Sequence, residues 1–124
     1  MKKELVLMAA IMIATAPVAF ADETGLAGMH EWKQEKGRRV CMTDHFHDGA
    51  GKGKTQKEAR AAAERAWIDF TAFEYGSVWG SFKLAVSNTM ECKEAGAVWS
   101  CFTSARPCKR YVKPRSGYAK SAGR

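Results

Sequence analysis

The chain has 124 residues, and its 20 Lys and Arg against 13 Asp and Glu give a formal net charge of +7. Hydrophobic residues make up 46% of the sequence, which excludes a disordered or collagen-like chain. This length allows one domain with a modest core and excludes a two-domain enzyme.

The first 21 residues have the pattern of a secretory signal peptide. A basic start is followed by an apolar run over residues 5–20 and a small-x-small site that ends at Ala21. The run is shorter than the ~20 residues of a membrane-spanning helix. We therefore predict a bacterial protein with a Sec-type signal peptide (1–21) cleaved after Ala21, periplasmic or secreted, with no transmembrane segment after processing. The rest divides into a single domain over 22–108 and a basic tail over 109–124, which we expect to be disordered.

The four cysteines all follow the predicted cleavage site. An even number of cysteines in an oxidising compartment predicts two disulfides, for which three pairings exist. We favour Cys92–Cys101, across a hairpin, and Cys41–Cys108, which would tie together the two ends of the domain. No CxxC motif occurs, so the sequence lacks the thioredoxin-like redox motif.

Residues 31–46 are expected to form one or two strands, with a turn near Gly37. His45 and His47 are spaced i, i+2, so both rings would leave the same face of a strand. Together with the nearby Asp44, Asp48 or His30 they form a candidate Zn²⁺ or Cu²⁺ site, since imidazole and carboxylate suit both metals. The alternative is that the two histidines are ordinary surface residues.

Residues 48–54 contain three glycines in seven positions and are predicted to be a loop. Its glycine amides, with Lys52 and Lys54, precede a helix and make a candidate anion-binding site. The alternative is a solvated basic loop. A P-loop is excluded, because Asp48 stands where that motif requires glycine.

A long helix is predicted over residues 56–75. The segment from Thr55 to Glu58 is a capping box, and Gly76 is a typical helix end. The apolar residues behind the cap fall on one helical stripe, which we expect to pack on a sheet. This stripe consists of Ala59, Ala62, Ala63, Ala66, Trp67, Phe70 and Phe73.

A short helix over 78–84 and a β-hairpin follow, with strands at 86–91 and 98–105. A turn at Gly96-Ala97 would place Cys92 opposite Cys101. Trp32 and Trp79 either belong to the core or form an exposed aromatic surface for a ligand or partner. The predicted fold is α+β: one long helix packed on a small antiparallel sheet, in strand–helix–hairpin order, stabilised by disulfides.

The positive charge is concentrated at the C-terminal end. Residues 106–124 contain seven basic and no acidic residues, whereas residues 22–105 contain 11 basic and 12 acidic ones. The candidate partner-binding cations there are Lys109, Arg110, Lys113 and Arg115.

These features predict a non-catalytic binding or interaction module whose basic tail contacts an acidic envelope component or an acidic protein. Export argues against nucleic acid as the native partner. The alternatives are a periplasmic metal-binding protein that uses His45 and His47, and a small secreted enzyme or enzyme inhibitor. The sequence contains neither GxSxG nor HExxH and no paired carboxylates, so no catalytic residue is nominated and no cofactor is predicted.

Overall fold

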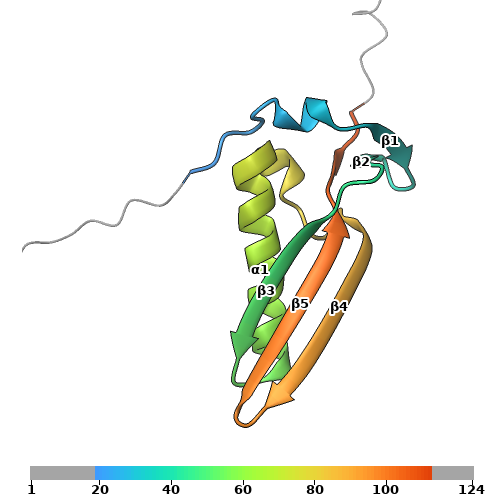
Figure 1. Cartoon of the computed structure of the whole chain (residues 1–124). Coiled ribbons are helices and arrows are strands. Elements are labelled where there is room, and N and C mark those ends of the chain that lie inside the picture. The colour runs from blue at the N-terminus through green and yellow to red at the C-terminus, as the bar shows by residue number, and fades with distance from the viewer. Residues whose placement is uncertain (1–18, 113–124) are drawn as a thin grey trace, which may run out of the picture.

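The computed structural model describes residues 19–112, so most of the predicted signal peptide and the chain from Lys113 onward lie outside the described residues. In this range two three-stranded antiparallel sheets accompany one long helix (Figure 1). The elements in chain order are η1 (Leu26–Met29), β1 (Trp32–Glu35), β2 (Arg39–Met42), β3 (His47–Gly53), α1 (Gln56–Tyr75), η2 (Ser77–Trp79), β4 (Val86–Ala95), β5 (Val98–Arg106) and β6 (Cys108–Arg110).

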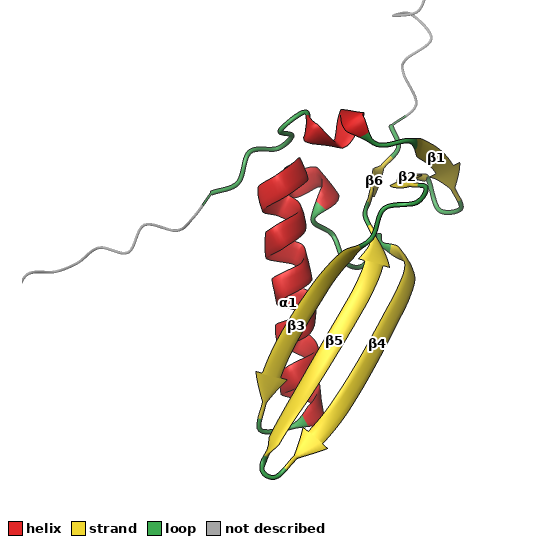
Figure 2. Cartoon of the chain, in the orientation of Figure 1, coloured by secondary structure: helices red, strands yellow, loops and turns green. Residues whose placement is uncertain are grey.

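The larger sheet has the strand order β3-β5-β4, and α1 lies along one of its faces (Figure 2). The smaller sheet, β1-β2-β6, lies at the end of the molecule near the last turn of α1 and beside the N-terminal segment (Figure 1). The predicted α+β class, with its helix packed on antiparallel strands, is confirmed.

Helix α1 has the bounds that its end signals predict. The Thr55 hydroxyl accepts a hydrogen bond from the Glu58 amide, and the Gly76 amide donates to the Ala72 carbonyl. The second half of the capping box differs from expectation, because the Glu58 carboxylate accepts from the Lys54 amide and not from that of Thr55.

The predicted loop at 48–54 is wrong, since residues 47–53 form β3 and pair with β5. Gly49, Gly51 and Gly53 alternate along this strand and face α1. A Cβ on Gly51 would lie 2.3 Å from the Ala63 nitrogen, and one on Gly49 would lie 2.3 Å from the Ala63 carbonyl oxygen. The glycines therefore let helix and strand approach with almost no side chain between them.

The hairpin and both disulfides are confirmed. Strands β4 and β5 are joined by the predicted two-residue turn at Gly96-Ala97, and Cys92 is the direct cross-strand partner of Cys101. Cys41 is likewise the cross-strand partner of Cys108, in the β2–β6 pair of the smaller sheet.

The core of α1 differs from the predicted stripe in its second half. Phe70 and Phe73 are 49% and 72% exposed, whereas Thr71 and Tyr75 are buried. Apart from Ala72, the buried positions advance four residues at a time, as Ala59, Ala63, Trp67, Thr71 and Tyr75. Four residues exceed one helical turn of 3.6, so the buried row winds around the helix and leaves the two phenylalanines outside it.

The contact between α1 and β3 leads to a stability prediction. Replacing Gly51 with alanine should lower the free energy of unfolding by about 1–3 kcal/mol, because the new methyl group meets helix backbone. Urea unfolding followed by circular dichroism measures this change. Gly28→Ala is the matched control, since a Cβ there meets nothing within 4 Å. Equal stability of the two variants would contradict the tight contact.

The two disulfides should differ in their effect on stability. Cys41–Cys108 spans 67 residues and Cys92–Cys101 spans nine, so the first restricts the unfolded chain more. Alanine replacement of both cysteines should lower the free energy of unfolding by about 4 kcal/mol for the long pair and about 2.5 kcal/mol for the short pair. Denaturant midpoints of the two double variants test this order, and the reverse order would contradict it.

Candidate functional site

The three histidines of the chain gather beside the last turns of α1. His30 stacks on His45 with ring centroids 4.1 Å apart, and His45 meets His47 edge-on at 5.0 Å. His47 in turn stacks on Tyr75 at 4.9 Å, and the Tyr75 hydroxyl lies 2.8 Å from His30 Nε2. The result is an aromatic cluster that connects the N-terminal segment to the helix.

His47 is the buried centre of this cluster. The Thr71 hydroxyl donates to the Trp67 carbonyl, so His47 Nδ1–H donates to the Thr71 oxygen at 2.9 Å. Its Nε2 lies 3.0 Å from Glu74 Oε2, although the two groups are not aligned as a hydrogen bond. Burial lowers the pKa of His47 to about 4, against the opposing effect of the Glu74 carboxylate. The ring is therefore neutral at neutral pH.

The metal-binding residues predicted from sequence are only partly brought together. His45 and His47 are neighbours, but Asp44 and Asp48 are exposed. Within residues 19–112, no group of three or more His, Cys, Asp or Glu side chains is arranged to hold a metal ion. Metal binding by His45 and His47 stays a prediction of the sequence.

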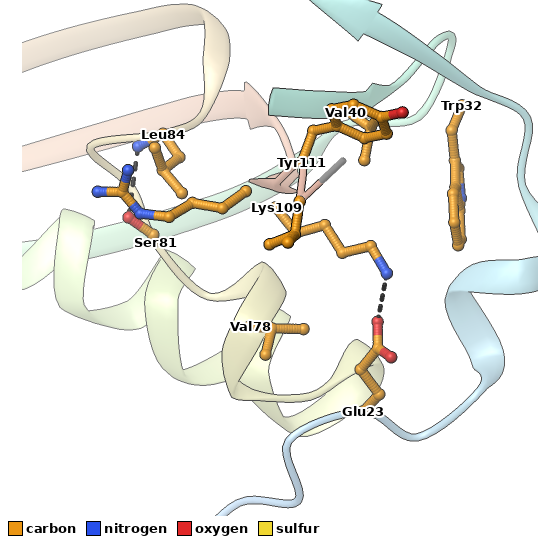
Figure 3. Close-up of a pocket in the computed structure, with 10 residues that line it drawn as sticks. Glu23, Trp32, Val40, Val78, Ser81, Leu84, Lys109 and Tyr111 are labelled. Carbon is orange, nitrogen blue, oxygen red and sulfur yellow. Dashed lines mark hydrogen bonds and ion pairs between the residues drawn. The ribbon is translucent and has the colours of Figure 1, made fainter. Parts of the chain in front are cut away.

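A second feature is an open hollow of about 770 Å³ beside the smaller sheet, which we call the groove. Residues from five separate parts of the chain line it, and most of them are apolar or aromatic (Figure 3). They are Glu23, Trp32, Val40, Val78, Ser81, Leu84, Lys109, Arg110, Tyr111 and Val112.

Lys109 supplies a charge to this apolar lining. Its ammonium lies 2.6 Å from Glu23 Oε1, 4.8 Å from the centroid of the Trp32 ring and 5.3 Å from that of Trp79. Figure 3 shows the lysine side chain reaching to Glu23, with Trp32 standing beside them. The ammonium is thus held by one carboxylate and by cation–π attraction to two indole rings.

The two tryptophans of the predicted aromatic surface have different positions. Trp32 is 39% exposed and lines the groove, whereas Trp79 is fully buried. Of the two alternatives stated for Trp79, the structure shows the core: its ring packs edge-on against Trp32 at 5.0 Å and joins Met42 and Tyr75 there. Val40, Val78 and Leu84, which also line the groove, were not identified from the sequence.

The predicted cationic residues fall into three groups. Lys109 and Arg110 belong to β6 and line the groove. Lys52 and Lys54 are exposed at the end of β3 away from His47. The Lys54 amide of the candidate anion site donates to the Glu58 carboxylate. Lys113 and Arg115 lie outside the described residues.

The chain matches no protein-family model, and the searches of curated proteins and of solved structures gave no match. Two disulfides fit a protein of an extracellular or periplasmic compartment. None of the described helices has the length and apolar character needed to cross a membrane.

The environment of His47 leads to a pH prediction. A pKa of about 4 in the folded state, against 6.5 for the ordinary histidine, means that the unfolded chain binds the proton more tightly. The free energy of unfolding should therefore fall as the pH drops from about 6.5 to about 4, by roughly 3 kcal/mol from this residue. His45, whose pKa is lowered by burial, acts in the same direction.

Proton NMR titration of the ring measures the pKa of His47 directly. The matched variant is Glu74→Gln, which removes the carboxylate that raises this pKa and should lower it further. A titration midpoint of His47 near 6.5 in the folded protein would contradict the prediction.

Proposed function

We propose that the protein is an exported, non-catalytic binding module that holds an acidic protein segment in the groove. The observation that carries this proposal is the combination of an apolar, aromatic lining with Lys109 and Arg110 at the same place. The partner would insert apolar side chains between Trp32, Val78 and Tyr111 and place its carboxylates against the cations.

The size and chemistry of the groove support a peptide-like ligand. A hollow of about 770 Å³ lies within the range of pockets that take side chains or small ligands, roughly 300–1,000 Å³. Tryptophan, tyrosine and arginine, all present in this lining, are the residues that most often dominate binding energy at interfaces.

The surrounding charges favour an acidic partner. Arg110 lies opposite Arg39 in the β2–β6 register, and the adjacent Arg38 accepts the Tyr111 amide at its carbonyl. Glu23 is the acidic residue that lines the groove. The described cations here thus outnumber the carboxylates, and the basic residues from 113 onward continue directly from Val112.

A protein segment is favoured over a membrane surface as the partner. A lipid headgroup layer is attracted by any exposed cluster of lysine and arginine and needs no cavity. The groove instead offers concave apolar walls from η2, β1, β2 and the segment after β6, which suit inserted side chains.

Binding of a designed peptide tests the proposal. The probe is a short dye-labelled peptide that contains glutamate, phenylalanine and leucine among glycine and serine, titrated with residues 22–124 and followed by fluorescence polarisation. We expect saturable binding that weakens with added salt. Trp32→Ala and Tyr111→Ala should each weaken it about tenfold, as loss of an aromatic anchor does.

Two controls make the test specific. Phe73→Ala removes an exposed aromatic residue outside the groove and should leave the affinity unchanged. A peptide with glutamine in place of glutamate should bind weakly. Absence of peptide binding, together with binding to phosphatidylglycerol vesicles that Trp32→Ala does not affect, would contradict the proposal and favour a membrane partner.

A further inference from the structure

We infer that Lys109 is the carboxylate-recognition point of the groove and that Glu23 occupies it in place of the carboxylate of the partner. This inference rests on the proposed function. It adds that Lys109 binds the carboxylate of the partner and that Glu23 competes for the same ammonium. The juxtaposition that carries it is the ammonium of Lys109 between two indole rings and the Glu23 carboxylate.

Lys109 is held in a fixed position. It follows Cys108, which is bonded to Cys41, and it pairs with Val40 across β2 and β6. Its ammonium faces Trp32 and the buried Trp79, so the side chain is directed along the aromatic wall of the groove. A cation positioned in this way binds a carboxylate with a defined geometry, unlike a lysine on a mobile stem.

Glu23 is presented to this ammonium by a segment that is fastened on both sides of it. On one side the Asp22 carbonyl accepts from the Val78 amide, and on the other the Thr24 amide donates to the Tyr75 carbonyl. The Thr24 hydroxyl also donates to the Glu74 carbonyl at 2.6 Å. The backbone therefore stays in place while the Glu23 side chain is free to turn away.

Gly76 is what allows this segment to lie against the end of α1. Its φ of +105° is in the region that glycine favours, and a Cβ on it would lie 2.3 Å from the Asp22 carbonyl oxygen. The last turn of the helix thus fixes the position of Glu23 relative to the groove.

The exposures of Glu23 and Lys109 indicate which of the two side chains an incoming carboxylate replaces. The Glu23 side chain is 50% exposed, whereas that of Lys109 is 23% exposed. An incoming carboxylate therefore reaches the ammonium by replacing the more exposed Glu23, while Lys109 remains against the tryptophans. Exchange of one carboxylate for another leaves the ammonium paired throughout, so it avoids leaving a partly buried charge without a partner.

The ligand class that follows is a peptide carboxylate close to an apolar or aromatic side chain. The carboxylate would contact Lys109, and the apolar group would lie against Trp32 and the neighbouring Val78 and Tyr111 walls. Acidic chains without apolar groups would gain only the charge contact.

Substitution of Glu23 tests this inference with the same dye-labelled peptide. Glu23→Gln keeps the shape of the side chain and removes its charge. It should therefore tighten peptide binding about threefold, which corresponds to the free energy of a partly exposed ion pair. Lys109→Gln should weaken binding about tenfold. In the double variant the gain from Glu23→Gln should disappear, because the ammonium for which the two carboxylates compete is absent.

Asp22→Asn is the matched control. It changes the net charge by the same amount one residue away, and Asp22 makes no contact with Lys109. Equal effects of Glu23→Gln and Asp22→Asn on peptide affinity would overturn the inference that Glu23 competes with the peptide for Lys109. If the wild-type protein still binds the peptide in that case, the proposed function stands. Failure of both wild type and Glu23→Gln to bind the peptide would overturn the proposed function and this inference together. Circular dichroism confirms that each variant is folded.

Discussion

The contact of the glycine row of β3 with α1 is the constraint on which the rest of the structure depends. The inward positions of β3, read backward, are Gly53, Gly51, Gly49 and His47, and they meet successive turns of the helix. The helix positions opposite them grow from Ala59 and Ala63 to Trp67 and Thr71. Strand and helix thus touch by backbone at one end and by large side chains at the other.

This gradient of side-chain size determines where His47 and its neighbouring titratable side chains are placed. At the glycine end there is no room for a side chain between strand and helix. At the other end His47 begins the strand and packs between Phe70 and Tyr75. The last turn of α1 receives Thr24 and the adjoining η2 receives Asp22, and these two contacts set the position of Glu23. The histidine cluster and one side of the groove are thus both fixed by the end of one helix.

The smaller sheet is tied to this framework by Arg106, the last residue of β5. Its guanidinium donates to the Met42 carbonyl in β2, to the Ser87 hydroxyl in β4 and to the Glu35 carboxylate in β1. These bonds couple both sheets across the short connection at Pro107. A guanidinium suits this role because its donors diverge in a fixed plane.

The features that the sequence predicted well depend on short-range rules. The Thr55 cap, the Gly76 end and the Cys92–Cys101 pair each involve residues that are close in sequence or face each other across a two-residue turn. The loop prediction failed because glycine is used both for turns and for strands in close contact. The available signal was the alternation of Gly49, Gly51 and Gly53 at the period of a strand, followed by an alanine-rich helix.

The groove could not be found in this way. Val40, Val78, Leu84 and Tyr111 come from segments that only the tertiary fold brings together, and none has a local pattern that marks it. The position of Trp79 stayed open between core and surface for the same reason, since its burial depends on Trp32, Met42 and Tyr75 from three distant elements. His30 joins the cluster through η1, whose position follows from the hydrogen bonds of Thr24.

The contacts of Arg106 and Lys109 change the interpretation of the positive charge in residues 106–124. Residues 106–124 contain seven basic side chains, but Arg106 is buried in the link between the sheets, and Lys109 and Arg110 belong to β6. Charge that the fold does not position attracts anions without regard to direction, and salt screens that attraction. An ammonium fixed between two indole rings and a carboxylate instead selects the position of the group it binds. In the proposed binding of an acidic partner, the directed contact would therefore be made by Lys109 of the folded domain.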